Sequence, residues 1–171
     1  MSEATPPRHW STAFTKNLLG ATLLVALFAA SYVQTTYAVG FDLQGARCLP
    51  WIAYLITKDA DIAVERGGVY ALRFPGDEQL AGRTLLKIAA GLPGDQVKLD
   101  RRGVWINGRY WGPMHPFQVD RILSAGRDPF STEVVPPGKL FMLGTLPQSY
   151  DSRYVGLVDR TAIEGKALPL W

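Results

Sequence analysis

The sequence predicts a mostly β domain that follows a single N-terminal transmembrane helix. Short runs rich in Val, Tyr, Leu and Phe alternate with Pro-Gly turns at positions 75, 93 and 137, a pattern typical of strands joined by tight turns. Asn-Gly at 107–108 separates two aromatic-bearing runs and is the strongest short-range hairpin signal in the chain. The stretch 17–41 carries no charge and is long enough to cross a bilayer as a tilted helix.

Composition limits the classes of protein to which the chain can belong. With 171 residues, 47% of them hydrophobic and 19% charged, the chain has enough apolar material for one packed domain, which excludes global disorder. The formal net charge is +3, and beyond residue 41 the basic and acidic residues nearly balance. Because no basic stripe with interleaved aromatic residues is present, we expect no nucleic-acid partner.

The N-terminal region divides into a polar tail, 1–16, and a predicted membrane anchor, 17–41. A cleavable signal peptide is the competing interpretation, because Thr36 and Ala38 place small residues at the −3 and −1 positions of a cleavage site. The apolar stretch is long for the core of a signal peptide, which favours an anchor. Lys and Arg flank the stretch in nearly equal numbers, so the positive-inside rule alone leaves its orientation open.

Residues 42–171 form the predicted β domain. The strands that we expect cover 68–74, 84–90, 96–100, the hairpin 104–111, 140–143 and 162–168. The segment 112–135 is interrupted by Pro113, Pro116, Gly126 and Pro129 and is predicted to be a long loop or an insertion. No helix is predicted outside the membrane segment.

Lys87 stands in the apolar run 84–90, which has the composition of a buried strand and is followed by the turn 92–95 (LPGD). Pro at the second and Gly at the third position of that turn specify type II. A lysine drawn into an apolar strand loses hydration, which favours its neutral amine and makes it a candidate base. The alternative is a lysine whose stem lies on the core while its ammonium group reaches water.

Three motifs occur in order along the chain: 48–50 (CLP), 87–95 (KIAAGLPGD) and 149–156 (SYDSRYVG). They resemble the Ser-x-Pro, lysine and Ser-x-Asp-Ser-Arg-Tyr-x-Gly boxes of type I signal peptidases, and the stretch 136–142 (PPGKLFM) is also similar to that family. The resemblance implies a membrane-anchored protease with a signal-peptidase-like β domain in 42–171. Such enzymes use a nucleophile and a lysine in place of a triad.

Cys48 is the only cysteine, so it has no partner for an intrachain disulfide. Taken alone, a free cysteine is more often a small buried residue with an inert thiol. Within the resemblance, Cys48 occupies the position of the acylating serine and is the predicted nucleophile. A thiol ionises more readily than a hydroxyl, so either a neutral Lys87 removes its proton or a cationic Lys87 stabilises a thiolate.

The resemblance assigns supporting roles to the third motif. Ser149 is expected to hydrogen-bond Lys87 and orient it, while Asp151 and Arg153 are expected to pair and to hold their strand in place. Without the resemblance, Asp151 and Arg153 indicate an ordinary surface ion pair on an extended segment, worth less than about 1 kcal/mol. In the family, a hydroxyl two residues before the nucleophile helps the nucleophile's own N–H to hold the oxyanion. That position here is Ala46, so a second donor must come from elsewhere.

The short chain, the single span and the segment 48–54 (CLPWIAY) resemble the TraF-type peptidases of conjugative transfer, with Ala53 in place of a glycine of their pattern. Members of that branch mature pilin subunits, and some join the new carboxyl end to the pilin's own amino terminus. The resemblance implies a bacterial inner-membrane protein with a cytoplasmic tail and a periplasmic domain. Its expected partners are membrane lipid and an exported, pilin-like precursor that is cut after a small residue. Because amines compete with water better for a thioester than for an oxygen ester, Cys48 leads to the hypothesis of cyclisation.

Two other functions are compatible with the sequence. One is a non-catalytic β domain that binds a pilin or another secretion component, with Cys48 merely buried, and the other is a general signal peptidase. His115 is the runner-up base because Cys-His is the commoner pair in thiol proteases, whereas His9 precedes the membrane segment. One cysteine and two separated histidines make no ligand cluster, so no metal or organic cofactor is predicted.

Overall fold

The computed structural model describes residues 12–42, 47–73 and 83–171. The chain forms two compact units, Met1–Thr36 and Tyr37–Trp171.

The described part of the first unit is one helix, α1 (Thr12–Thr36). Its segment Phe14–Thr36 has a mean hydropathy of 1.7, and none of it is buried inside the protein. The hydroxyls of Thr22 and Thr35 donate to backbone carbonyls of the preceding turn, which satisfies them without water. By length and composition, α1 can therefore cross a membrane.

The helix and the predicted anchor 17–41 differ at both ends. α1 begins before residue 17, and the last part of the predicted range forms the strand β1 (Tyr37–Phe41), which pairs antiparallel with β2 (Ala53–Thr57). An uncharged run does not reveal where a helix gives way to a strand, because the strand depends on a pairing partner that comes later in the chain.

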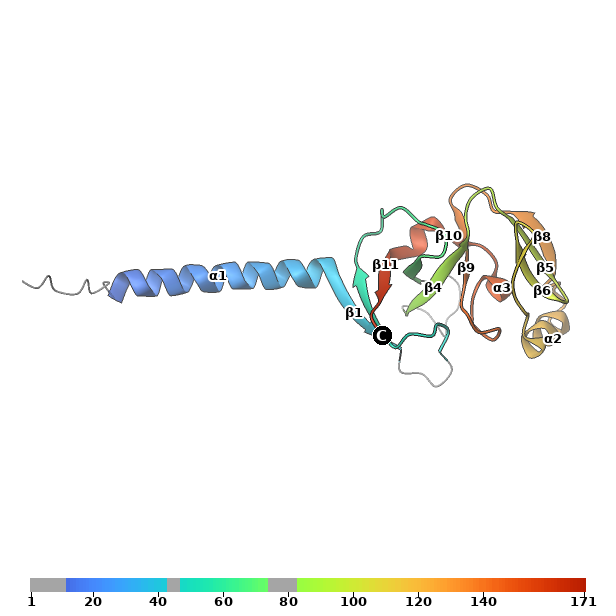
Figure 1. The fold of residues 1–171 in the computed structure, drawn as a ribbon, viewed down its shortest axis with the longest axis horizontal. Helices are drawn as coiled ribbons and strands as arrows, with labels where there is room; N and C mark the ends of the chain where they lie inside the picture. The colour runs from blue at the N-terminus through green and yellow to red at the C-terminus, as the bar shows by residue number, and fades with distance from the viewer. Residues whose placement is uncertain (1–11, 43–46, 74–82) are drawn as a thin grey trace, which may run out of the picture. The chain divides into compact units, whose positions relative to one another are not determined.

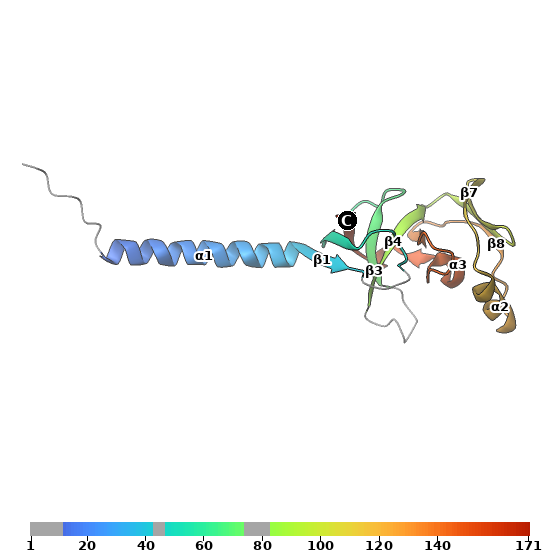
Figure 2. The same cartoon turned by 60° about the horizontal axis from the view of Figure 1, so that its bottom comes forward.

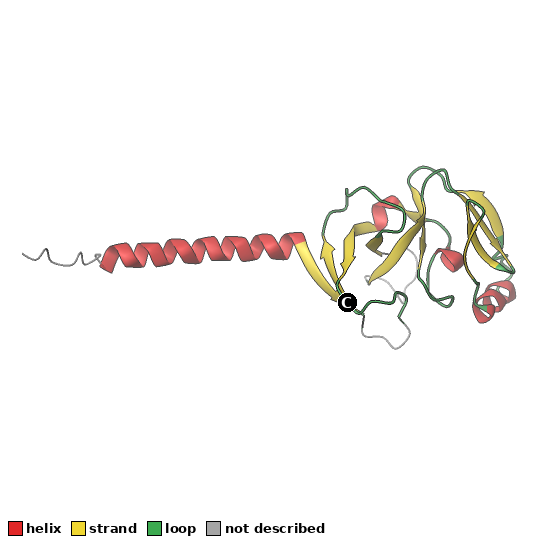
Figure 3. Cartoon of the chain, in the orientation of Figure 1, coloured by secondary structure: helices red, strands yellow, loops and turns green. Residues whose placement is uncertain are grey.

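The second unit contains two antiparallel sheets (Figure 1, Figure 3). The larger has seven strands in the order β1, β2, β11 (Ile163–Pro169), β3 (Val69–Arg73), β4 (Thr84–Gly91), β9 (Lys139–Leu143) and β10 (Val158–Asp159). The smaller has four strands in the order β7 (Arg109–Gly112), β6 (Gly103–Ile106), β5 (Gln96–Asp100) and β8 (Ser131–Val134). The fold class is thus mostly β with one apolar N-terminal helix, as predicted.

Three short helical segments accompany the sheets of this unit: α2 (Pro116–Ser124), α3 (Ser152–Val155) and the 3-10 turn η1 (Arg160–Ala162). Figure 1 and the turned view of Figure 2 both place α2 beside the smaller sheet, at the end of the unit that lies away from β1. Its buried residue Ile122 joins the core cluster that includes Val97, Val104 and Phe141.

The predicted turns that fall within the described residues have the expected backbone geometry, whereas the Pro-Gly pair at 75–76 lies outside the described residues. In the turn after β4, Gly94 has φ of 91° and the N–H of Asp95 donates to Leu92 O at 2.9 Å, as type II requires. Between β6 and β7, Asn107 and Gly108 have φ of 49° and 76°, the two positive values of a type I′ hairpin turn.

Of the two interpretations of 112–135, a long loop or an insertion, the long loop was wrong, and so was the expectation of no helix outside the membrane segment, since 112–135 contains α2 and β8. Pro116 does not break the helix but occupies its first turn, where the missing N–H has no intrahelical partner to lose. Gly126 follows the end of α2 with φ of 72°. β8 pairs with β5, so its formation depends on a strand far away in the sequence.

Candidate active site

Lys87 lies in β4, which is flanked by β3 and β9 in the larger sheet, and it pairs in register with Tyr70 of β3. Its side chain is buried, with the residue 1% exposed. The amine Nζ forms a hydrogen bond with Ser149 Oγ at 3.0 Å. Among the described residues no carboxylate pairs with Lys87, so the structure does not show the water-reaching lysine of the alternative interpretation.

Ser149 lies in the segment between β9 and α3 and is itself buried. Its hydroxyl packs against Gly144, where an added Cβ would lie 2.3 Å from Ser149 Oγ. The N–H of Ser149 donates to Leu146 O at 3.1 Å, which folds the segment back on itself. Only glycine fits at position 144 without a shift, because the serine that contacts Lys87 fills the space that a side chain would need.

Asp151 and Arg153 form a buried ion pair, with side chains 0% and 1% exposed and 2.6 Å between Arg153 Nη2 and Asp151 Oδ2. Arg153 also donates to the carbonyls of Gly144, Leu146 and Pro113. Asp151 accepts from Gly144 N–H at 2.8 Å and from Arg153 N–H at 3.1 Å. With both charges surrounded by hydrogen-bond partners, the pair fixes the segment 144–153 that carries Ser149.

The expected pairing of Asp151 with Arg153 is present, and the local structure differs from the expected one. Asp151 is the N-cap of α3 and Arg153 lies inside that helix, so the pair does not lie on an extended segment. The interpretation as a surface ion pair was wrong, because both side chains are buried.

Cys48 is half-buried and lies in an irregular segment before β2. Its carbonyl accepts two hydrogen bonds from Thr145, one from the N–H at 2.8 Å and one from Oγ1 at 3.0 Å. A Cβ on Gly144 would also lie 2.9 Å from Cys48 O. The backbone of Cys48 and the hydroxyl of Ser149 therefore both lie against the same glycine.

The neighbours of Cys48 anchor its segment in the core. Leu49 is 1% exposed and packs in a cluster with Ile88, the residue after Lys87, and with Tyr54. Burial raises the pKa of Tyr54 to about 12, so its phenol stays neutral, and it donates to Trp51 O at 3.1 Å. This cluster ties the Cys48 segment to the strand that carries Lys87.

The remaining candidates have other places in the structure. His115 is the N-cap residue of α2, where its N–H donates to Tyr154 Oη, and its Nδ1 is buried without a described partner. Its described contacts do not include Cys48. His9 and Ala46 lie outside the described residues. Within the described ranges, no group of three or more His, Cys, Asp and Glu side chains is arranged to hold a metal ion.

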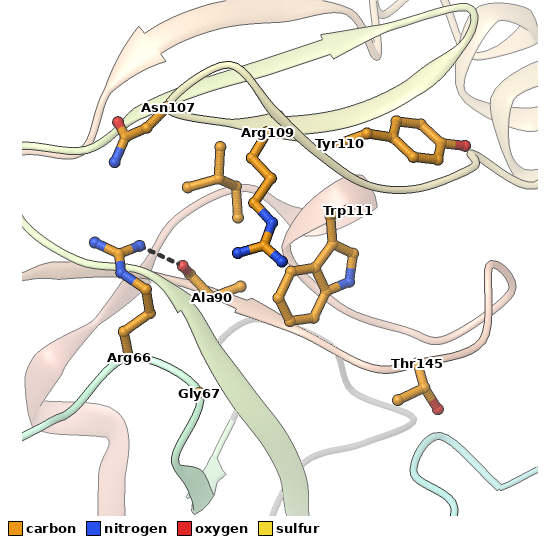
Figure 4. A pocket seen from close by; sticks show the side chains of 9 residues that line it. Arg66, Gly67, Ala90, Asn107, Arg109, Tyr110, Trp111 and Thr145 are labelled. Atoms are coloured by element: carbon orange, nitrogen blue, oxygen red, sulfur yellow. Dashed lines mark hydrogen bonds between the residues drawn. The ribbon is translucent and has the colours of Figure 1, made fainter.

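An open pocket of about 890 Å³ lies between the larger sheet and the β6–β7 hairpin (Figure 4). The residues that line it are Arg66, Gly67, Ala90, Ile106, Asn107, Arg109, Tyr110, Trp111 and Thr145. Since Thr145 also holds the carbonyl of Cys48, the pocket reaches the segment of the predicted nucleophile. We call it the hairpin groove.

Sequence reasoning missed Gly144, Thr145 and the groove residues of the hairpin. Gly144 follows the last residue of β9, and only its position just before the third motif marks it in the sequence. Thr145 and Arg109 carry no signal of their own, because their roles depend on residues brought close by the fold.

Comparison with known proteins agrees with the resemblance of the three motifs. The conjugal transfer protein TraF of Agrobacterium fabrum (strain C58 / ATCC 33970) is 38% identical over 89 residues, which cover 51% of this chain and 48% of TraF. The chain thus spans about half the length of this curated relative. Among solved structures, a signal peptidase I from Enterococcus faecalis V583 has a TM-score of 0.42 and 27% identity, over 61% of this chain and 97% of that one. The family model described as signal peptidase, peptidase S26, matches residues 10–171, and because it covers almost the whole sequence, this protein belongs to the peptidase S26 family of signal peptidases.

Proposed function

We propose that this protein is a membrane-anchored peptidase that cleaves an exported precursor with Cys48 as nucleophile and Lys87 as its proton-transfer partner. The observation that carries the proposal is the buried Lys87 amine, held by Ser149 Oγ at 3.0 Å beside the glycine that also contacts Cys48 O. A buried lysine without a carboxylate partner is the environment in which lysines serve as bases.

The reaction has two halves. The Cys48 sulfur attacks the carbonyl carbon of the scissile bond after its proton has passed to Lys87, and the same outcome follows if the pair starts as thiolate and ammonium. Lys87 then gives its proton to the leaving amine as the C–N bond breaks, which leaves a thioester on Cys48. Water or an amine then attacks the thioester carbon and gives a proton to Lys87. The C–S bond breaks, the Cys48 sulfur recovers its proton from Lys87, and the new carboxyl end leaves as an acid or as an amide.

The oxyanion of each tetrahedral intermediate needs a donor near Cys48. The N–H of Cys48 makes no hydrogen bond to another described residue, so it remains available for that role. Ser149 does not touch the reacting atoms in this scheme; it orients the Lys87 amine. Asp151 and Arg153 in turn fix the segment of Ser149.

The proposed substrate is a pilin-like precursor that is cut after a small residue, and the proposed site is the periplasmic face of a bacterial inner membrane. The similarity to a conjugal transfer protein supports the substrate class. The apolar helix α1 supports the anchor, with membrane lipid around it. Cyclisation follows if the attacking amine is the amino terminus of the same pilin.

The test is cleavage of co-expressed exported precursors with Ala-x-Ala sites, including pilin precursors of conjugative systems, read by mass spectrometry. Wild type is expected to cut a precursor, and Cys48→Ala and Lys87→Ala are expected to lose cutting. Lys139→Ala is the matched control, because this lysine pairs with Asp159 at the surface. Cys48→Ser shows whether the thiol is essential, and the product mass separates a linear from a cyclic product.

If Lys87→Ala cuts the precursor as well as wild type does, the proposed pair of Cys48 and Lys87 is wrong. If wild type leaves every precursor uncut, the non-catalytic binding domain becomes the better hypothesis. If wild type cuts many unrelated precursors and sustains cells that are depleted of their housekeeping peptidase, the chain is a general signal peptidase.

A further inference from the structure

The hairpin groove carries a positive charge that no described residue of the protein neutralises. Two arginines line it. Arg66 is paired with Asp95, at 2.6 Å, and donates to Ala90 O at 2.8 Å. The Arg109 side chain forms no hydrogen bond or ion pair with another described residue, and no carboxylate is among the described residues that line the groove. Within the part of the chain that the structure describes, the groove therefore keeps one guanidinium group without a partner.

The strand β7 presents Arg109 and Trp111 to the same side. Tyr110, which stands between them and also lines the groove, turns its ring toward Trp105, with ring centroids 4.9 Å apart. In Figure 4, Arg109 and Trp111 extend from the hairpin toward β4 and Ala90. The groove thus offers a guanidinium group next to an indole ring that is 37% exposed.

This cationic surface is continuous with the candidate active site. Thr145 lines the groove and holds Cys48 O with both its N–H and its hydroxyl. A polypeptide whose scissile bond lies at Cys48 can therefore run past Thr145 into the groove. The volume of about 890 Å³ is sufficient for several side chains.

We propose that the hairpin groove binds an acidic side chain of the substrate polypeptide near the scissile bond, through Arg109. Trp111 contributes apolar contact to the neighbouring part of the same segment. This inference rests on the proposed peptidase function and adds the substrate class: a precursor with Asp or Glu close to its cleavage site. Arginine suits this role because its planar guanidinium group holds a carboxylate with two parallel hydrogen bonds.

The test measures peptide binding to the full-length Cys48→Ala protein in detergent micelles by fluorescence polarisation. The probes are short labelled peptides with an Ala-Leu-Ala core, capped at both ends, each with one Glu at a different distance from the core and each matched by a Gln peptide. At one distance, the Glu peptide is expected to bind about tenfold more tightly than its Gln match at low salt, and the preference is expected to shrink as salt rises.

Arg109→Gln is expected to abolish the preference for Glu. Arg101→Gln, which removes an arginine of the turn between β5 and β6 that does not line the groove, is expected to keep it. Equal binding of Glu and Gln peptides at every distance, or an unchanged preference in Arg109→Gln, would overturn the inference. A preference seen only when the C-terminal cap is removed would show that the groove takes a terminal carboxylate and would equally refute an acidic side chain.

The binding readout needs no catalysis, so it separates this inference from the proposed function. If the protein cleaves precursors but binds Glu and Gln peptides equally, the peptidase function is supported and the acidic-residue site is refuted. If the protein binds Glu peptides selectively but cleaves no precursor, the acidic-residue site is supported and the peptidase function is refuted.

Discussion

Lys87 and Cys48 enter the candidate site from regions that are built differently. Lys87 projects from an eight-residue strand inside the larger sheet, and its partner Ser149 is fixed by a buried ion pair with many hydrogen bonds. Cys48 lies in an irregular segment, where Thr145 holds its carbonyl and Leu49 is buried beside it. Lys87, the proposed base, is thus fixed by the core of the fold, whereas Cys48, the proposed nucleophile, is held by a few local contacts. Changes around Lys87 are therefore expected to affect folding, and changes around Cys48 to affect reactivity.

The largest effect is expected from Arg153→Ala. This variant leaves the Asp151 carboxylate buried without its cation and removes the donors to three carbonyls, so the free energy of unfolding should fall by about 3–5 kcal/mol. Urea unfolding of the solubilised protein measures it. Lys166→Ala is the control, since its pair with Glu65 is exposed and is worth less than about 1 kcal/mol. Similar losses of unfolding free energy in both variants would show that the buried pair of Asp151 and Arg153 does not fix the segment that carries Ser149.

The next largest effect is expected from Gly144→Ala. The new methyl group would lie 2.3 Å from Ser149 Oγ and 2.9 Å from Cys48 O, so one of the two must move. We expect a loss of about 1–3 kcal/mol in unfolding free energy together with loss of cleavage. Gly112→Ala is the matched control, because nothing lies within 4 Å of its added Cβ. If Gly144→Ala retains cleavage, the close packing of Ser149 and Cys48 against Gly144 is not needed for activity.

A smaller effect concerns the turn at the end of β4. The Arg66 guanidinium beside Asp95 lowers the pKa of that carboxyl to about 2, and the N–H of Leu92 and the amide of Asn107 also donate to it. Because the pKa of Asp95 is lower in the folded than in the unfolded protein, its carboxylate stabilises the fold at pH values above about 4, the unfolded pKa. This contribution is lost as the pH falls toward about 2, the folded pKa. Because Arg66 is half-exposed, we expect a contribution of about 1 kcal/mol.

Asp95→Asn tests this contribution through urea unfolding at a series of pH values. The difference in unfolding free energy between wild type and variant should be constant near neutral pH and should shrink between about pH 4 and about pH 2. Asp159→Asn, at the more exposed pair with Lys139, should show a smaller dependence. If the difference in unfolding free energy does not change with pH, the ion pair between Arg66 and Asp95 does not stabilise this turn.

The smallest effect on stability is expected beside Cys48, the proposed nucleophile. Thr145→Val removes the hydroxyl donor to Cys48 O but keeps the N–H donor, so the unfolding free energy should change by less than about 1 kcal/mol. The rate at which iodoacetamide alkylates Cys48 should nevertheless change, and as Cys48 is the only cysteine the reaction reports on it alone. Thr132→Val on the exposed strand β8 is the control. An unchanged alkylation rate would show that Thr145 does not position Cys48.

Much of the β framework was predictable because its signals are local. The strands after Lys87 and around the Asn-Gly turn follow from period-two patterns and from turn residues that need positive φ. The strand β1 and the helix α2 were not predictable in this way. β1 was assigned to the membrane helix because its uncharged residues carry no strand signal without β2, and α2 was missed because its proline can start a helix as well as end one.

The sequence by itself determined the family, the mostly β fold, the apolar helix and the identity of the residues expected in the site, since these depend on motifs and on local periodicity. Tertiary structure decided where those residues lie. Only the folded chain buries Asp151 with Arg153, brings Ser149 to Lys87 and joins Thr145 to Cys48 across 97 positions of sequence. The physical reason is that burial and hydrogen-bond partners are set by contacts between distant segments, which no local pattern of residues records.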